Sequence, residues 1–438
     1  MILSGWGRTT AQDCRVSRPR SEAELAARVA EGGLIARGAG RAYGDAAQSA
    51  ANTVDMGGFR RMIAFDDATG QLVAEAGVTL DEVIATFLPR GWFPAVTPGT
   101  RFVTLGGAVA ADVHGKNHHR DGSFGATVDW IDLMGPDGRV RRVAPGDPLF
   151  GWTVGGMGLT GVILRVALRL KAVETGYIRQ RTLPAPHLAA AMATFEANTD
   201  ATYSVAWIDC LARGPSLGRS LVLLGEHAAL ADLPEDARAR PFHPPAPKRR
   251  LVPFEAPGFL LNGLTVRAFN EVYWRAGLAG LGERLVGWAP YFYPLDAVEG
   301  WNRIYGRRGF VQFQCALPLA VAAGALEALL REISAAGQGS FLAVLKRFGP
   351  QAGAFSFPME GYTLALDFPL HAGTAALLDR LDRIVVTAGG RFYLAKDARM
   401  SRAVFEAAEP RAAAFRGFRT AEGLAGAFGS TQSERLGL

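Results

Sequence analysis

Residues 97–125, TPGTRFVTLGGAVAADVHGKNHHRDGSFG, combine residue types that could surround a large ligand. Six glycines and a run of small apolar residues lie beside three histidines, the cations Lys116 and Arg120, and the hydroxyl of Ser123. Glycines let the main chain approach a ligand closely because no Cβ intervenes. Polar side chains beside such a wall are unfavourable to bury unless a partner satisfies them. A flat cofactor with polar edges would meet both conditions, whereas a surface loop with incidental histidines is the plainer interpretation.

A second glycine loop, ARGAGRAYGDAA at residues 36–47, follows a short apolar strand expected at 34–36. Gly38, Gly40 and Gly44 are spaced G-x-G-x-x-x-G, which differs from the G-x-G-x-x-G fingerprint of dinucleotide-binding folds. The main-chain N–H groups of such a loop could still bind a pyrophosphate, with Arg41 nearby. An ordinary glycine turn explains the same spacing equally well.

Two glutamines suggest a polar wall in the second half of the chain. The segment 309–318 is expected to form a strand, in which Gln312 and Gln314 point to the same face. Their amides would either bind a ligand or meet water, and the strand pattern alone does not decide between these alternatives.

The elements that position these residues are short in the first ~170 residues. Capping boxes at Ser21–Glu24 and Thr79–Glu82 predict two helix starts, and Pro136-Asp137-Gly138 predicts a hairpin. We expect helices at 22–31 and 80–88, a helix start at Asp147-Pro148, strands at 72–76, 128–133 and 139–143, and a glycine turn running into a long strand within 155–170. Mixed short strands and helices indicate an α+β domain.

The pattern of expected elements changes after Lys171, where longer helices alternate with strands. We expect helices at 187–197, 320–336, 374–388 and 402–418, and strands at 203–209, 220–224, 309–318, 341–348, 362–368 and 391–397. This order predicts an antiparallel sheet with helices on one side.

Composition excludes several classes of protein. The 438 residues suffice for two or three domains, and a net charge of +6 without a recognition motif gives no nucleic-acid signature. Cys14, Cys210 and Cys315 have no paired spacing, which favours reduced thiols in the cytoplasm. We find no signal peptide, no run of ~20 apolar residues for a membrane span, and no metal-ligand spacing.

The segment 238–258, RARPFHPPAPKRRLVPFEAPG, is expected to be a mobile surface loop because of its prolines and charges. It interleaves Lys248, Arg249 and Arg250 with apolar residues. A solvated loop is one interpretation. A lid that contacts a lipid or membrane surface through cations and apolar tips is the other.

Six motifs, taken together and in order, carry a family resemblance. They are ARGAGRAYGD (36–45), HGKNHH with DGSFG (114–125), GGMGLTGVI (155–163), FYPLDAVEGWNRIYGRRGF (292–310), LKRFGP (345–350) and FYLAKDARM (392–400). They resemble the decaprenylphosphoryl-β-D-ribose 2′-oxidase family of vanillyl-alcohol-oxidase-type FAD flavoproteins. The likeness spans nearly the whole chain and is weakest at 238–258.

The resemblance implies a two-subdomain FAD-binding domain of the PCMH type at 1–175 and a substrate-binding domain at 176–390. The C-terminal segment 391–438 would return to the FAD domain. Within the substrate domain, 238–258 would be the mobile loop.

The resemblance also implies the site residues. FAD would be bound by Ala36, Arg37, Gly38, Ala39, Gly40, Arg41, Ala42, Tyr43, Gly44, Asp45, Ala46, Gly99, Thr104, Leu105, Gly106, Gly107, Ala111, Asp112, Val113, His114, Ile163 and Tyr393. Substrate would contact Gln312, Gln314, Lys346 and Lys396, and the catalytic residues would be Lys396, His114 and Tyr43. Lys396 would orient the hydroxyl and stabilise negative charge, while the base could be His114, Lys396 or a water.

Two departures from related patterns lead to predictions. Related aldono-lactone oxidases carry a histidine, bonded covalently to flavin, where Arg41 stands here, so we expect non-covalent FAD. The family's cysteine, to which covalent nitroarene inhibitors attach, is replaced by Ala365, so we expect no covalent capture.

The implied activity is oxidation of the 2-hydroxyl of a polyprenylphosphoryl ribose to a keto sugar, with hydride transfer to flavin N5. An NAD(P)H-dependent short-chain reductase would complete a two-enzyme epimerisation in cell-wall biosynthesis. The enzyme would be cytoplasmic, with possible peripheral contact to the inner membrane face through 238–258. A soluble sugar or aldono-lactone oxidase on the same scaffold is the main alternative, and a flavoprotein that binds without turnover is another.

Overall fold

A three-stranded parallel sheet carries the first glycine loop in the computed structural model, which describes residues 1–258 and 260–438. The sheet contains β3 (Val16–Ser17), β5 (Asn52–Asp55) and β4 (Leu34–Arg37), in that order. Helix α1 (Glu22–Val29) packs on it, because Leu25 and Val29 share a buried cluster with Leu34. The Ser21 side chain accepts a hydrogen bond from the N–H of Glu24 at the predicted helix start. A hairpin of β1 (Ile2–Leu3) and β2 (Gln12–Asp13) precedes these elements.

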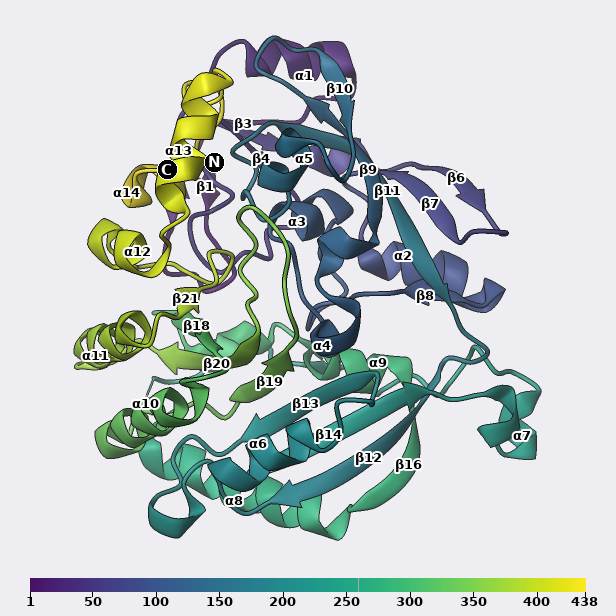
Figure 1. Ribbon diagram of the computed structural model, residues 1–438, viewed down its shortest axis with the longest axis vertical. Coiled ribbons are helices and arrows are strands. Elements are labelled where there is room, and N and C mark those ends of the chain that lie inside the picture. The colour runs from purple at the N-terminus through teal and green to yellow at the C-terminus, as the bar shows by residue number, and fades with distance from the viewer. Residues whose placement is uncertain (259) are drawn as a thin grey trace.

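A second, antiparallel sheet completes the N-terminal half (Figure 1). Its path is β10 (Val140–Val143), β9 (Val128–Met134), β11 (Val162–Ala172), β7 (Gln71–Glu75) and β6 (Met62–Asp66), with β8 (Trp92–Pro94) also paired to β11. Four helices belong to this part of the chain: α2 (Leu80–Phe87), α3 (Leu105–Ala110), the short α4 (His118–Asp121) and α5 (Pro148–Thr153). The pairing of β9 with β10 and the Thr79–Glu82 capping box confirm the predicted hairpin and helix start.

An eight-stranded antiparallel sheet forms the C-terminal half. Its order is β16 (Gly282–Gly287), β12 (Tyr177–Ala185), β14 (Ser220–His227), β13 (Tyr203–Ile208), β19 (Val344–Phe348), β20 (Gly361–Pro369), β18 (Phe310–Pro318) and β21 (Arg391–Phe392). The predicted domain boundary at 175–176 falls between β11 and β12.

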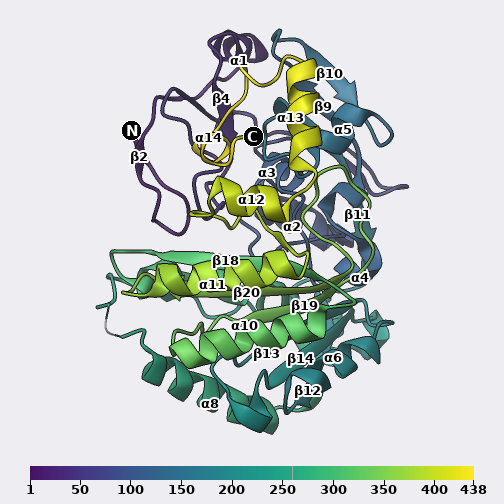
Figure 2. The ribbon, with the colours of Figure 1, turned by 60° about the vertical axis from the view of Figure 1, so that its left-hand side comes forward.

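One face of this sheet is the main hydrophobic core. Helices α6 (Leu188–Glu196), α10 (Ala322–Ala336) and α11 (Thr374–Thr387) cover it, and α10 and α11 lie side by side in Figure 2. The strand register aligns Ala206, Leu345, Leu364 and Cys315 across four strands on this face, and all four are buried. Alternation along each strand therefore sends their neighbours to the opposite face.

The opposite face, which we call the cavity face, carries Trp207, Val344, Ala365 and Gln314 in the same register. Helix α8 (Gly263–Ala279) packs on its outer strands, where Tyr273 contacts Trp207 with ring centroids 4.7 Å apart. The expectation of helices on one side thus omitted α8, together with the short α9 (Trp288–Phe292).

The C-terminal segment returns to the N-terminal half, as Figure 1 shows in yellow beside the purple start. It contains α12 (Arg402–Ala408), α13 (Ala412–Ala421) and α14 (Thr431–Leu436), and Phe428 pairs with Leu34 of β4. The prediction of one helix at 402–418 was wrong because Pro410 interrupts it. The predicted strand 391–397 also ends early, at Phe392, where the N–H of Lys396 turns back to the Tyr393 carbonyl.

The segment 238–258 is partly attached to the rest of the chain. It begins at the end of α7 (Glu235–Arg238), and β15 (Arg250–Leu251) pairs in parallel with β17 (Val298–Glu299). Glu255 also forms an ion pair with Arg8 at 2.6 Å. The predicted mobility of this loop remains a prediction. Within 1–258 and 260–438, no helix has the length and apolar character needed to cross a membrane.

Candidate active site

A cavity of about 1090 Å³ lies where the two halves meet. The glycine loops of the N-terminal half line one side, and the cavity face of the large sheet lines the other. Pockets for a single small ligand usually measure about 300–1,000 Å³. This volume therefore accommodates a large cofactor together with a second molecule.

The glycines on the first side are required by close packing. A Cβ on Gly38 would lie 2.2 Å from Thr104 Oγ1, and a Cβ on Gly106 would lie 2.8 Å from the Cβ of Ala76. Thr104 itself caps α3 by accepting a hydrogen bond from the N–H of Gly107. The two glycine loops thus form one wall with its main chain next to the cavity.

Arg41 supplies a positive charge on this wall. Its guanidinium lies 4.4 Å from the Trp6 ring centroid and 5.2 Å from that of Phe102, and its Nε is buried without a hydrogen-bond partner among the described residues. Burial lowers the pKa of Arg41, and Asp296 partly opposes that shift. An unsatisfied cationic donor beside an uncovered glycine main chain fits the phosphates of a dinucleotide cofactor.

Most residues predicted to bind the cofactor line this cavity. They are Ala36, Gly38, Ala39, Gly40, Arg41, Ala42, Tyr43, Ala46, Gly99, Thr104, Gly106, Gly107, Ala111, Val113, His114, Ile163 and Tyr393. Arg37, Gly44, Asp45, Leu105 and Asp112 do not line it. The four residues predicted to contact substrate, Gln312, Gln314, Lys346 and Lys396, all do.

Asp112 does not line the cavity because its carboxylate is bound by other residues of the protein. Its buried carboxylate accepts hydrogen bonds from Ser123 Oγ at 2.6 Å and from the N–H of Gly125 at 2.8 Å, and also from Ser356. It therefore fixes the loop that carries His114, and it adopts a positive φ of 40° there. Burial raises the pKa of Asp112, and the hydroxyl and N–H donors oppose that shift.

The other four predicted residues that do not line the cavity contact the rest of the protein instead. Arg37 donates to the carbonyls of Ala47 and Ser4, while Asp45 binds Arg435. Gly44 packs against Asp397, and a Cβ on Gly44 would lie 2.1 Å from the carbonyl oxygen of Asp397. Leu105 is fully buried in the core.

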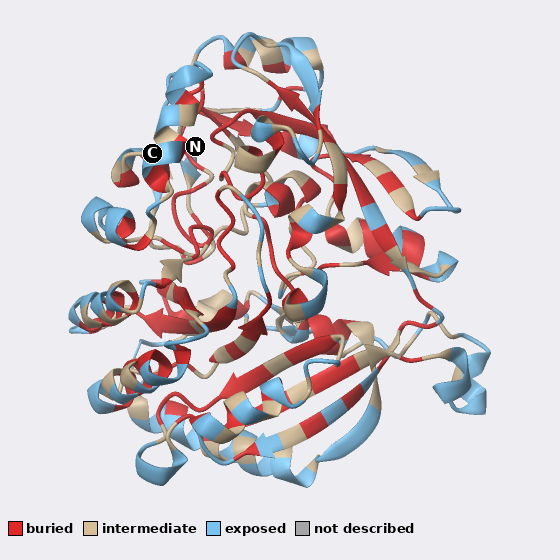
Figure 3. Ribbon diagram, viewed as in Figure 1, coloured by how far each residue is buried: buried red, intermediate tan, exposed pale blue. Residues whose placement is uncertain are grey.

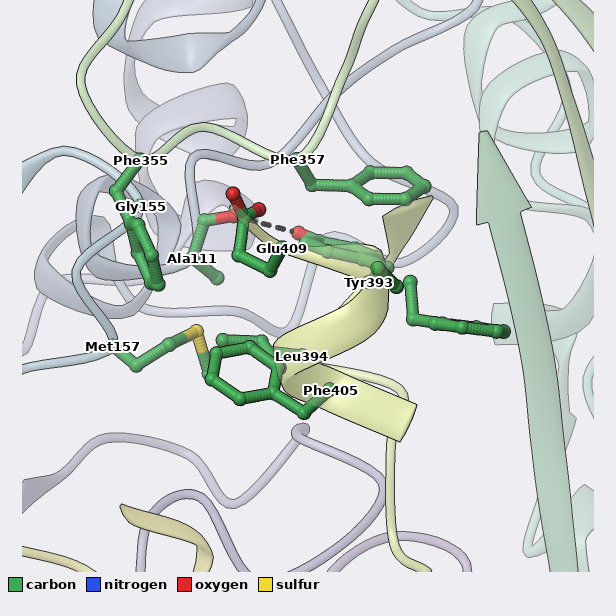
Figure 4. Close-up of a pocket in the computed structure, with 11 residues that line it drawn as sticks. Ala111, Gly155, Met157, Phe355, Phe357, Tyr393, Leu394, Phe405 and Glu409 are labelled. Atoms are coloured by element: carbon green, nitrogen blue, oxygen red, sulfur yellow. Dashed lines mark hydrogen bonds between the residues drawn. The ribbon is translucent and has the colours of Figure 1, made fainter. Parts of the chain in front are cut away.

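Tyr393 separates the main cavity from a second one of about 20 Å³ (Figure 4). Its hydroxyl donates to the Ala111 carbonyl at 2.9 Å, and its ring stacks on Phe357 with centroids 4.7 Å apart. Phe405 lines only the smaller space, whereas Met157 lines both cavities. Tyr393 therefore ties the C-terminal segment to the end of α3 at the cavity wall.

His114 lies between two polar residues of the large sheet. Its Nε2 is 3.0 Å from the Gln314 amide nitrogen, and its Nδ1 is 3.2 Å from Lys346 Nζ. Burial lowers the pKa of His114 well below its ordinary value, and the charge of Lys346 adds to that effect. His114 is therefore a neutral imidazole near pH 7.

The hydrogen bonds around Gln314 indicate the tautomer. Thr363 Oγ1 donates to the Cys315 carbonyl, so it accepts from the Gln314 amide, which then also donates to His114 Nε2. A neutral imidazole that accepts at Nε2 carries its proton on Nδ1, where it faces Lys346. An uncharged Lys346 amine has a lone pair that can accept the hydrogen bond from this Nδ1–H.

Three lysines, Lys116, Lys346 and Lys396, line the cavity. Burial lowers the pKa of Lys346 to about 7, with a further contribution from the charge of Lys396, and it lowers the pKa of Lys116 to about 7 as well. Lys116 donates to the carbonyl oxygens of Tyr291 and Phe292 at the end of α9. These residues can take up or release a proton near neutral pH.

Lys396 and Asp367 both line the cavity, and their charges interact although the two groups form no direct ion pair. Lys396 Nζ lies 3.9 Å from the centroid of the Tyr43 ring, and Asp367 Oδ1 accepts from Gln312 Nε2 at 2.5 Å. Tyr305 donates to the other carboxylate oxygen at 3.4 Å. Burial lowers the pKa of Lys396, which the Asp367 charge opposes, and burial raises the pKa of Asp367.

Asp367 is a candidate residue that the sequence prediction missed, together with Trp207 and Tyr305. A signal was present, because β20 places Asp367 two residues after Ala365 and so on the same face. A carboxylate buried on a strand face is rare unless it is paired.

Comparison with known proteins agrees with this geometry. Residues 15–144 match the model of an FAD binding domain. The chain is 37% identical, over 449 residues, to a decaprenylphosphoryl-β-D-ribose oxidase of Mycolicibacterium smegmatis, covering 100% of this chain and 97% of the relative. The chain belongs to the decaprenylphosphoryl-β-D-ribose oxidase family.

Two further relatives carry less specific names. An uncharacterized protein in the mprA 5′ region of Streptomyces coelicolor is 37% identical over 82% of this chain and 100% of its own length. An uncharacterized oxidoreductase of the fasciation locus of Rhodococcoides fascians is 29% identical over 34% of each chain. Membership of the decaprenylphosphoryl-β-D-ribose oxidase family makes the chain an FAD-dependent oxidoreductase with an α+β fold.

Proposed function

We propose that this enzyme oxidises the 2-hydroxyl of a polyprenylphosphoryl ribose to a ketone. The observation that carries the proposal is that Lys396 and Asp367, whose charges interact, line the same cavity as the two glycine loops. The full-length relative named as an oxidase of decaprenylphosphoryl ribose supports the substrate class.

FAD would be held by the two glycine loops together with Arg41, Tyr393 and Ile163, and Arg41 would bind its phosphates. When bound, FAD supplies the hydride acceptor, flavin N5, for the oxidation of the alcohol. Arg41 offers no nucleophilic nitrogen of the kind that a histidine offers, so we infer that FAD is held without a covalent bond.

The hydroxyl proton needs an acceptor, and Lys396 Nζ is best placed for this role. Burial keeps a fraction of Lys396 uncharged near neutral pH, and the amine can accept the proton as the carbonyl forms. The Asp367 carboxylate then stabilises the resulting ammonium. The Tyr43 ring, below the amine, positions it by a cation–π contact.

His114 serves as a positioning residue in this proposal. Both of its ring nitrogens already contact protein atoms, Gln314 on one side and Lys346 on the other. A histidine committed in this way is a poor proton acceptor for substrate, which leaves Lys396 as the base. His114 keeps Lys346 directed at the cavity.

Lys346 and Lys116 would bind the phosphodiester of the substrate. An incoming anion raises the pKa of a buried lysine, so both would become ammonium ions as the substrate enters. Either contact would be that of a point charge rather than a bidentate fork. The ketone product would then pass to an NAD(P)H-dependent short-chain reductase, which would complete an epimerisation at C2. We place the enzyme at the cytoplasmic face of the inner membrane, where such a lipid would be available.

Anaerobic titration of the purified protein tests the proposal. Polyprenylphosphoryl ribose should bleach the flavin absorbance, whereas free sugars and aldono-lactones should not. Bleaching by lactones alone would identify a soluble lactone oxidase. Failure of every polyol to bleach the flavin would indicate a flavoprotein without this activity.

A further inference from the structure

Helix α8 has an unusual distribution of apolar residues. Val266 and Asn270 are its only buried residues, although the helix has 17 residues and most helices of this length bury a full stripe. Gly277 marks the same inner side, because a Cβ there would lie 2.1 Å from Leu221 on the cavity face of the sheet. The side of α8 that faces the protein is therefore known.

The opposite side of α8 is exposed and mostly apolar, with one charged pair, Arg275 and Glu271, among its apolar residues. At 100° per residue, Leu264, Ala268, Val272, Ala276 and Ala279 lie away from the buried positions, and all five are exposed. Leu264 keeps 75% of its surface exposed and Val272 keeps 68%. We call these five residues the α8 outer face. Solvent-facing sides of helices usually carry charged or polar residues instead.

Exposed apolar residues also concentrate in the chain around α8. Of the sixteen large hydrophobic residues that are exposed in the described chain, nine lie between residues 251 and 281. They include Leu251, at 58% exposure, and Phe254, at 68%. Figure 3 shows α8 mainly in pale blue and tan, and Figure 1 shows it at the outer margin of the molecule. Such a concentration marks an interaction surface.

Positive charge accompanies this surface. Residues 238–284 contain eight lysines and arginines and three glutamates, so they carry a net charge of +5 in a chain whose total is +6. Two of the glutamates are already paired, Glu255 with Arg8 and Glu271 with Arg219. The surface is complementary to an anionic partner with an apolar interior.

The cavity extends to the same segment. Arg249, Phe269, Tyr273 and Arg284 line the cavity and also belong to 238–284. Phe269 and Tyr273 lie on the flank of α8 between its buried and outer faces. This end of the cavity therefore lies next to α8, on the flank that adjoins the α8 outer face.

We propose that the α8 outer face docks the enzyme on an anionic lipid bilayer, with Leu264 and Val272 inserted among the acyl chains. Lys248, Arg250 and Arg267 would contact the lipid headgroups. The choice of a bilayer over a second copy of the chain follows from the net charge of +5, because two such faces would repel each other. The choice of a bilayer over another protein rests on the proposed lipid-linked substrate.

Vesicle flotation of the FAD-loaded, full-length enzyme tests this docking. We expect binding to vesicles of phosphatidylglycerol and phosphatidylcholine, little binding to pure phosphatidylcholine, and loss of binding in 0.5 M salt, a condition of about 4 Å screening length. The double variant Leu264→Ser/Val272→Ser should bind at least about tenfold more weakly, because interfacial binding scales with inserted apolar area. Lys248→Ser should weaken binding by about fivefold.

Matched variants on other surfaces serve as controls. Val321→Ser removes an apolar side chain that is 45% exposed near α10, and Arg139→Ser removes an exposed cation from the N-terminal hairpin. Both should bind vesicles like the wild type, and all variants should retain FAD and the wild-type melting temperature.

Three outcomes would overturn the docking proposal. They are no binding of the wild type to anionic vesicles, equal binding by the Leu264→Ser/Val272→Ser variant, and a wild-type dimer that this variant dissociates without any effect of vesicles. Vesicle binding is measured without turnover, so a failure of the proposed oxidation would appear separately, as absence of flavin bleaching in an enzyme that still floats with lipid.

Discussion

Arg435 and Asp45 bind each other across almost the whole length of the chain. The Arg435 guanidinium contacts the two carboxylate oxygens of Asp45 at 2.9 and 2.6 Å, and it also reaches Asp397 at 2.8 Å. Asp45 belongs to the first glycine loop, and Asp397 follows Lys396. The last helix of the chain therefore connects the first glycine loop to the residue that follows Lys396, the lysine proposed as the base.

We predict that Arg435→Met weakens both stability and FAD binding. The change leaves two buried carboxylates without their cation, and breaking a buried pair typically destabilises a protein by about 3–5 kcal/mol. Since Arg435 is partly exposed, we expect about 2–3 kcal/mol, measured by chemical denaturation. Arg402→Met removes an exposed pair with Glu406 and should change stability by less than about 0.5 kcal/mol. Equal effects of the two variants would contradict the prediction.

A second prediction concerns Asp367→Asn. Without the carboxylate, the pKa of Lys396 should fall further, because the Asp367 charge is what opposes the lowering by burial. A base is active in its deprotonated form, so the rate of flavin reduction rises with pH through the pKa of Lys396. The rising limb should therefore move to lower pH in the variant, while the maximal rate falls about 10²-fold because the ammonium loses its partner.

Stopped-flow measurement of flavin reduction between pH 5 and 9 checks this shift. Lys396→Met should abolish the limb and retain FAD. An unchanged limb in Asp367→Asn would show that Lys396 and Asp367 are not coupled in the reaction. Thr160→Ala changes a buried hydroxyl that contacts Thr153 away from the cavity, and it should leave the profile as in the wild type.

How far the sequence predicts this site depends on the kind of residue. Local sequence patterns predict the glycine loops that contain Gly38 and Gly106, the strand β18 with its two glutamines, and the helix starts at the capping boxes. Asp367 was missed because burial of its carboxylate depends on pairing between β18 and β20, which lie 55 positions apart at Gln312 and Asp367. The residue pattern within one strand does not reveal which distant strand it pairs with.

Helix α8 and the turn at Lys396 escaped prediction for different reasons. The apolar residues of α8 face outwards as well as inwards, so the sequence shows no single stripe. Residues 393–396 look like a continuing strand, but the carbonyl of Tyr393 accepts from Lys396 and closes a turn. Tertiary contacts, here the Tyr393 bond to Ala111, override the local preference.

A third prediction concerns stability and pH. The pKa of Lys346 is lowered to about 7 by burial and by the charge of Lys396, whereas an unfolded lysine titrates near 10.4. Between about pH 7 and pH 10.4, the unfolded chain binds more protons at this residue, so its contribution to the free energy of unfolding increases with pH. The destabilisation is complete below about pH 7.

Lys346→Met should therefore raise the melting temperature of the FAD-free protein at pH 6 and have a smaller effect at pH 9.5. Differential scanning calorimetry at both values measures the difference. Lys248→Met, at an exposed position, should show no such dependence. A variant less stable than the wild type at pH 6 would mean that the ammonium of Lys346 is well solvated in the cavity.

A fourth prediction concerns flavin attachment. Because Arg41 stands where aldono-lactone oxidases attach flavin to a histidine, acid or heat should release FAD from the denatured chain. Absorbance of the supernatant after precipitation measures the released fraction, which we expect to be complete. Yellow, fluorescent protein in the pellet would contradict non-covalent binding.

The last prediction concerns Ala365, which lies on the cavity face between Val344 and Gln314. Nitroarene inhibitors that attach to a cysteine at this position in the family should leave the wild-type enzyme unmodified. The native thiols cannot substitute, because Cys14, Cys210 and Cys315 are all buried and burial raises the pKa of Cys210 and Cys315 to about 12. Ala365→Cys should gain one adduct per chain during turnover, located at residue 365 by mass spectrometry of peptides. A variant that turns over substrate but gains no adduct would show that the nitroarene is not activated next to residue 365 of β20. Adduct formation on the wild type would instead place a reactive nucleophile elsewhere in the cavity, with Lys396 as the first residue to examine.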